Sequence, residues 1–126
     1  MTGKAIIVSA PSGAGKTTIV KHLLSVFPRL AFSVSACSRT RRDKEQDGTD
    51  YYFITADQFR DKIRKDEFIE WQEVYPGRFY GTLKSEIDRI WLERRTPIFD
   101  VDVLGGINLK NYFGDAALQS LYNHRP

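Results

Sequence analysis

The stretch that decides the fold spans residues 5–17 and reads Ala-Ile-Ile-Val-Ser-Ala-Pro-Ser-Gly-Ala-Gly-Lys-Thr. It opens with the apolar run Ala5 to Ser9, whose β-branched side chains are typical of a strand buried on both faces of a parallel sheet. A glycine-rich turn follows, and from Lys16 onward the apolar residues recur at helical spacing until Pro28. The sequence therefore predicts a strand, a tight turn and a helix in succession.

The turn matches the P-loop pattern Gly-x-x-x-x-Gly-Lys-Ser/Thr, except that alanine stands at its first position. Gly13 and Gly15 allow backbone N–H groups to point inward around a phosphate, and the helix N-terminus adds positive partial charge. Lys16 is expected to reach the outer phosphates, and the Thr17 hydroxyl to ligate Mg²⁺. The alternative is a glycine-rich turn that binds nothing. The predicted ATP-binding residues are Ala10, Pro11, Ser12, Gly13, Ala14, Gly15, Lys16, Thr17 and Thr18.

An acidic residue is predicted to complete the metal site. Residues 98–103 read Ile-Phe-Asp-Val-Asp-Val and predict a further buried strand. In P-loop proteins Mg²⁺ is usually supported by an acidic residue from another strand. We therefore expect Asp100 and Thr17 to hold Mg²⁺, the alternative for Asp100 being a charge at a loop edge.

Strands that alternate with helices predict an α/β fold with a P-loop NTPase-type parallel sheet flanked by helices. We expect residues 1–35 and 83–126 to form this core and residues 36–82 to form a smaller mixed β/α insertion. Thr55 and Gln58 predict a capping box, and Thr82 is expected to cap the next helix, which Thr96-Pro97 ends. Other expectations are strands at 31–35, 51–54 and 68–74, a loop at 38–50 and a chain turn at 77–82.

Composition restricts the classes of function. The chain has 126 residues, enough for one domain, and its 19 basic against 16 acidic residues give a net charge of +3. Such a mixed surface favours small anionic ligands over nucleic acid. One cysteine excludes an intramolecular disulfide framework, and the first apolar run is too short for a signal peptide or a membrane span. We therefore expect a cytoplasmic location.

A second phosphate site is predicted at residues 38–42, which read Ser-Arg-Thr-Arg-Arg. Guanidinium forks match the geometry of a phosphate dianion, and serine and tyrosine hydroxyls lie nearby in the sequence. A solvated charged loop is the alternative interpretation. Because a P-loop alone does not identify the protein, this region discriminates between its families.

The sequence closely resembles guanylate kinase, the P-loop enzyme that transfers the γ-phosphoryl group of ATP to GMP. The matching stretches are A-P-S-G-A-G-K-T, F-S-V-S-x-x-x-R-T-x-R, G-x-D-Y-x-F, E-F-I-E-W, F-Y-G-T and I-F-D-V-D-V-x-G, in this order over residues 4 to 118. The chain departs from the family at Arg41, where proline is common, and at Asp43-Lys44, where Pro-Gly is common. We expect these changes to alter loop stiffness more than chemistry.

The resemblance implies roles for particular residues. Ser35, Arg39, Arg42, Tyr51 and Tyr80 would bind the GMP phosphate, whereas Glu70, Thr82 and Asp102 would recognise the base. An ionised Glu70 suits guanine on physical grounds, because guanine offers adjacent N–H donors where adenine presents a lone pair. An outward-facing strand carboxylate is the alternative for Glu70, and a helix cap for Thr82. The catalytic residues would be Lys16, Arg39, Arg42 and Asp100.

Two other classes of protein compete with this interpretation. Asp102-Val103-Leu104-Gly105 matches the D-x-x-G element of GTPases, but the chain has nothing like their N-K-x-D element. Guanylate-kinase-like modules that bind phosphorylated partner proteins share the region around Arg39, but they typically lack a complete P-loop. The alternative function is therefore a non-catalytic module of that kind.

The C-terminal part of the family fold is expected to be missing. The family has an Ile-Phe-Ile core strand after the helix that follows Asp102, whereas residues 119–126 read Gln-Ser-Leu-Tyr-Asn-His-Arg-Pro. We expect a truncation or a shifted reading frame, the loss of this core strand, and self-association along the open sheet edge. We also expect GMP binding to survive better than turnover, because lost transition-state arginines cost around 10³ to 10⁵ in rate.

Overall fold

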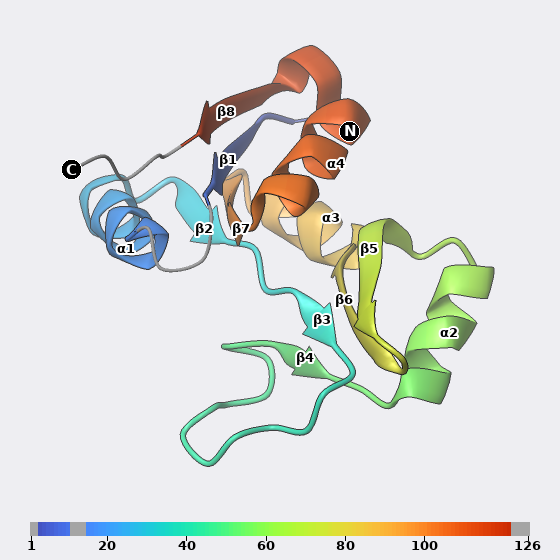
Figure 1. Cartoon of the computed structure of the whole chain (residues 1–126). Helices are drawn as coiled ribbons and strands as arrows, with labels where there is room; N and C mark the ends of the chain where they lie inside the picture. Colours follow the sequence, from blue (N-terminus) through green and yellow to red (C-terminus); the bar gives the residue numbers. More distant parts are fainter. Residues whose placement is uncertain (1–2, 11–14, 122–126) are drawn as a thin grey trace. The chain divides into compact units, whose positions relative to one another are not determined.

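A computed structural model describes residues 3–10 and 15–121 of the chain. It contains two compact units, Val34–Glu86 and the combination of Met1–Ser33 with Ile87–Pro126 (Figure 1). The larger unit holds the end of the P-loop and the smaller one holds the arginine-rich loop.

The larger unit contains a four-stranded parallel sheet with the strand order β2-β7-β1-β8. Buried Val8 and Ile98 from the sheet pack with Val20 of the first helix, as the apolar spacing of both segments predicts. The predicted parallel sheet flanked by helices is therefore confirmed. Its elements are β1 (Ala5–Ser9), α1 (Lys16–Val26), β2 (Leu30–Phe32), β7 (Thr96–Val101), α4 (Val103–Phe113), a 3₁₀ turn (Gly114–Ala116) and β8 (Ala117–Leu121).

The expected loss of the core strand after α4 is wrong. β8 pairs in parallel with all five residues of β1, from Ala5 opposite Ala117 to Ser9 opposite Leu121. The side chains did not predict this strand, because the hydrogen bonds that join β8 to β1 are made by backbone N–H and C=O groups, which every residue type except proline carries. Ala117 is 5% exposed but Leu118 is 70% exposed, so the segment lacks the apolar run of a strand covered on both faces.

The smaller unit contains a mixed sheet with the strand order β4-β3-β6-β5, in which β3 and β4 are parallel and the other pairs antiparallel. The α2 helix supplies Phe59, which is fully buried and stacks on Phe68 at 4.3 Å and on Phe79 at 4.9 Å between ring centroids. These three rings form the core of the unit. Its elements are β3 (Ala36–Cys37), β4 (Tyr52–Phe53), α2 (Ala56–Arg64), β5 (Phe68–Tyr75) and β6 (Arg78–Leu83). The helix α3 (Lys84–Leu92) begins in this unit, and its residues from Ile87 onward belong to the larger one.

Some predicted boundaries are confirmed and others are wrong. The capping box of Thr55 and Gln58 is present, with both reciprocal hydrogen bonds at the start of α2. Only Pro76-Gly77 turns the chain, with Gly77 at φ 78°, and the rest of the expected turn is strand β6. Because this strand continues to Leu83, Thr82 lies inside it and does not cap α3. Thr96-Pro97 opens β7, whereas α3 already ends at Leu92.

The stacked phenylalanines generate the first prediction. Phe59→Ala removes a fully buried ring and leaves a cavity, so we expect the free energy of unfolding to fall by about 3–5 kcal/mol. Tyr75→Ala, at a residue of the same unit that is 66% exposed, is the matched control and should change it by less than about 1 kcal/mol. Urea denaturation measures both. Equal losses in the two variants would contradict this description of the core.

Candidate functional site

The first group of predicted site residues lies at the carboxyl end of β1 and β7. The parallel register places Val8 opposite Asp100 and Ser9 opposite Val101, and the Ala10 N–H donates to the Val101 carbonyl at 3.4 Å. This pairing brings Asp100 to the start of the P-loop. The Thr17 hydroxyl then donates to the Asp100 carboxylate at 3.3 Å. Two residues 83 positions apart in the sequence thus share one edge of the sheet.

These two oxygen groups suit a magnesium ion that is shared with a bound phosphate. Mg²⁺ prefers oxygen ligands and is usually held by one or two carboxylates together with substrate phosphates. Within residues 3–10 and 15–121 no group of three His, Cys, Asp or Glu side chains could hold a metal by itself. A protein-only metal cage is therefore not the arrangement that this part of the chain offers.

The rest of the predicted ATP site is described only in part. Gly15 has φ 85°, a left-handed conformation that favours glycine, and Lys16 begins α1 immediately after it. Thr18 is exposed on the first turn of α1. Pro11, Ser12, Gly13 and Ala14 lie outside the described residues.

The second group of predicted site residues lies around Arg39 in the smaller unit. The Arg39 side chain is only 9% exposed, and its guanidinium carbon lies 5.1 Å from the centre of the Tyr51 ring. Tyr51 packs edge-on against Tyr80, with 6.0 Å between ring centroids. Hydrogen bonding to Glu45 is the main cause of the raised pKa of Arg39, and hydrogen bonding to Tyr80 raises it further. The structure therefore brings three predicted phosphate ligands together, one from each of three segments.

Glu45 is the residue of this cluster that the sequence analysis missed. Its two carboxylate oxygens accept hydrogen bonds from both terminal nitrogens of Arg39, at 2.7 and 2.6 Å. One of these oxygens also accepts the backbone N–H of Arg42 at 2.8 Å. These bonds, led by those from Arg39, lower the pKa of Glu45 from 4.5 to about 2. The sequence held no clear signal for Glu45, because residues 38–50 contain four acidic residues, Asp43, Glu45, Asp47 and Asp50, and their spacing does not distinguish Glu45 from the others.

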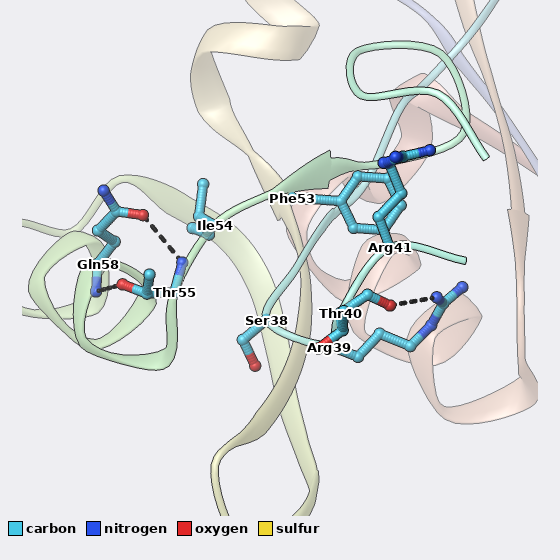
Figure 2. A pocket seen from close by; sticks show the side chains of 8 residues that line it. All are labelled: Ser38, Arg39, Thr40, Arg41, Phe53, Ile54, Thr55 and Gln58. Atoms are coloured by element: carbon cyan, nitrogen blue, oxygen red, sulfur yellow. Dashed lines mark hydrogen bonds between the residues drawn. The ribbon is translucent and has the colours of Figure 1, made fainter. Parts of the chain in front are cut away.

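The arginine-rich loop is further ordered by backbone contacts. Arg41 donates to the Glu45 carbonyl at 2.7 Å, so it fixes the loop, whereas Arg42 has an exposed side chain. An open pocket of about 300 Å³ lies beside the loop, and the capping box of α2 forms part of its wall (Figure 2). The alternative interpretation of a solvated charged loop is therefore wrong for Arg39, whose side chain is 9% exposed, whereas Arg41 and Arg42 are exposed. The pocket is lined by Ser38, Arg39, Thr40, Arg41, Phe53, Ile54, Thr55 and Gln58.

The predicted base-recognition residues lie in two different units. Glu70 of β5 is paired with Thr82 of β6, and the fully buried Thr82 hydroxyl donates to the Glu70 carboxylate at 3.1 Å. The hydroxyl therefore orients the carboxylate and does not cap a helix. Asp102 instead belongs to the larger unit, where it caps α4 and accepts the Gly105 N–H at 2.7 Å.

Ser35, the remaining residue predicted to bind the GMP phosphate, is partly buried, and its carbonyl accepts the Tyr52 N–H at 2.9 Å.

The parallel sheet and the P-loop place the chain among the P-loop α/β proteins. The family model for guanylate kinase matches residues 2–114. The chain belongs to the guanylate kinase family.

Similar sequences agree with this assignment, and a solved structure agrees with the fold. The chain is 49% identical over 118 residues to a guanylate kinase of Bacteroides thetaiotaomicron, covering 94% of this chain and 58% of the relative. It is 51% identical over 116 residues to a guanylate kinase of Porphyromonas gingivalis, covering 91% and 62%. A crystal structure of guanylate kinase from Anaplasma phagocytophilum matches with a TM-score of 0.75 at 24% identity, over 94% of this chain and 58% of that one. The chain thus spans about three fifths of the length of these relatives.

The Arg39–Glu45 pair generates a prediction about pH. Because the folded state lowers the Glu45 pKa, the pair contributes stability above about pH 4.5 and loses it as the pH falls toward 2. Carbon-detected NMR should find the Glu45 carboxylate still ionised at about pH 3. In Arg39→Gln the pKa of the same group should rise toward its ordinary value, with the contribution of the Arg42 N–H remaining. An ordinary titration of Glu45 in the unaltered chain would contradict the bidentate pair.

Proposed function

We propose that the protein binds Mg·ATP and GMP and transfers the γ-phosphoryl group of ATP to GMP, giving ADP and GDP. The observation that carries this proposal is the cluster of Arg39, Tyr51 and Tyr80, which offers one guanidinium and two hydroxyl groups to a phosphate dianion. The same unit holds Glu70 and Thr82 as a carboxylate and hydroxyl pair suited to guanine. Family membership and the P-loop support the assignment.

Binding of GMP would use the smaller unit. Arg39 enters the site already oriented by Glu45, so little side-chain entropy is lost when it meets the phosphate. Ser35, Tyr51 and Tyr80 would donate hydroxyl hydrogen bonds, and the exposed Arg42 side chain is free to supply a second guanidinium. An incoming phosphate competes with Glu45 for the Arg39 donors, of which two terminal nitrogens already contact the carboxylate.

Discrimination of guanine from adenine would depend on Glu70. The Glu70 carboxylate only accepts hydrogen bonds, and Thr82 already donates to one of its oxygens. Guanine can donate N1–H and N2–H to the carboxylate. Adenine would face it with the N1 lone pair, and a polar site rejects such an analogue by up to about 10⁴-fold. The role of Asp102 as a further contact to the base belongs to the same proposal.

The chemical step requires positioning and charge neutralisation. An oxygen of the GMP phosphate attacks the γ-phosphorus in line, and ADP leaves. That oxygen is already largely ionised, so the chain needs no general base. Lys16, Arg39 and Arg42 would supply positive charge, while Asp100 and Thr17 would hold the metal and its waters. Bound Mg²⁺ neutralises charge on the transferring phosphates.

The cell compartment proposed for this reaction is the cytoplasm. The single cysteine, Cys37, is free and buried, and burial raises the pKa of its thiol. None of the helices within residues 3–10 and 15–121 has the length and apolar character of a bilayer span.

The proposal is tested by calorimetric titration with GMP, with AMP as the ligand control. We expect saturable binding of GMP and none of AMP, and phosphorus NMR with Mg·ATP then detects transfer directly. Glu70→Gln should weaken GMP binding about 10- to 100-fold, because it replaces a charged acceptor. Glu73→Gln, on the exposed end of the same strand, is the matched control and should leave binding unchanged. A chain that binds neither nucleotide, or both equally, would refute the proposal.

A further inference from the structure

Glu86 carries a carboxylate that is almost completely buried. The residue is 2% exposed and lies in the first turn of α3, and none of the nucleotide-binding roles proposed above involves it. Removing a carboxylate from water is costly unless hydrogen bonds replace the lost hydration. The partners of this group therefore indicate what the carboxylate does.

Each oxygen of the carboxylate accepts a hydrogen bond from a different segment of the smaller unit. One oxygen accepts the backbone N–H of Val34 at 2.8 Å, and the other accepts the hydroxyl of Tyr52 at 2.6 Å. The position of Glu86 in the first turn of α3 adds a favourable interaction with the helix dipole. The carboxylate thus joins α3, the segment before β3 and strand β4.

Both partners are sequence neighbours of proposed phosphate ligands. Val34 directly precedes Ser35, and Tyr52 directly follows Tyr51. The Tyr52 N–H also donates to the Ser35 carbonyl at 2.9 Å, which closes a ring of hydrogen bonds between these segments and Glu86. The spacing between Ser35 and Tyr51 is therefore fixed by the backbones on both sides of that ring.

One of these hydrogen bonds also joins the two ends of the smaller unit. The chain enters this unit at Val34 and leaves it at Glu86. The bond from the Val34 N–H to the Glu86 carboxylate therefore ties the first residue of the unit to its last. Fraying of this junction would move Ser35, which lies one residue inside it.

We infer that Glu86 is a positioning residue for the phosphate group of GMP. It holds Ser35 and Tyr51 at the separation that a phosphate requires, and it acts through Val34 and Tyr52 without touching the nucleotide. The inference rests on the proposed function, since it concerns the phosphate half of the same site. The base half, at Glu70 and Thr82, is held by a separate hydrogen bond.

The test compares GMP with guanosine, which differs from it by the phosphate. Tyr52→Phe deletes one hydroxyl without creating a large cavity, and Glu86→Gln keeps the shape of the side chain. Each should weaken GMP binding about three- to tenfold and leave guanosine binding within about twofold of the unaltered chain. Tyr75→Phe, at an exposed tyrosine of the same sheet, is the matched control and should change neither. Calorimetry measures the affinities, and thermal melts verify that the variants are folded.

The outcomes separate this inference from the proposed function. Selective loss of GMP affinity supports the positioning role, whereas equal losses for GMP and guanosine would show a general structural role and overturn it. Unchanged GMP affinity in folded Tyr52→Phe and Glu86→Gln would also overturn it, with the proposed function intact. If the unaltered chain binds guanosine and GMP equally, or binds neither, the proposed phosphate site fails and the inference fails with it.

Discussion

The parallel pairing of β1 with β7 is the constraint on which the larger unit depends. It sets Val8 opposite Asp100, so the strand that leads into the P-loop ends beside the strand that carries the acidic residue. A shift of one residue in this register would turn Asp100 to the other face of the sheet. The Thr17–Asp100 contact could not then form. The buried contacts of Val8, Ile98 and Val20 oppose such a shift, so the apolar core and the polar site are specified together.

In the smaller unit the main feature is Arg39, which other residues of the chain hold in place without any ligand. Arg39 lies over an aromatic ring and is fixed by a bidentate carboxylate, a geometry that a guanidinium favours more than an ammonium does. Such preorganisation lowers the entropic cost of binding but leaves Glu45 as a competitor for the phosphate. In the proposed function, the affinity for GMP would therefore reflect a balance between these two effects. Glu86 contributes a second layer of order, since it fixes the backbones that carry Ser35 and Tyr51.

Much of the fold follows from local sequence signals. The apolar run of β1, the helical spacing of α1 and the capping box of α2 each depend on neighbouring residues, and the structure confirms all three. Strand β8 could not be predicted, because its main stabilising contacts are backbone bonds to β1, a partner more than 100 residues away in the sequence. The helix cap expected at Thr82 is wrong for a similar reason, because the pairing of Thr82 with Glu70 of β5 keeps it inside strand β6.

The candidate site also contains residues that the sequence predicts and residues that only the structure identifies. Motifs in the sequence locate Thr17, Asp100, Arg39 and Glu70, because the proposed binding of phosphate and guanine calls for those residue types. Glu45 and Glu86 were not predicted, since a carboxylate that orients other groups has no spacing of its own in the sequence. Whether such a residue is exposed, or buried against a tyrosine and a backbone N–H, depends on tertiary packing. Positioning residues are therefore the part of a site that requires a structure.

The most direct test of the account is a map of amide chemical shifts in the chain titrated with GMP and, separately, with a non-hydrolysable Mg·ATP analogue. We expect GMP to shift amide signals mainly in Val34–Glu86, around Ser35, Arg39 and Tyr51, and the ATP analogue to shift those of residues around Thr17 and Asp100. Shifts from both nucleotides that fall on the P-loop alone would contradict the assignment of two separate nucleotide sites.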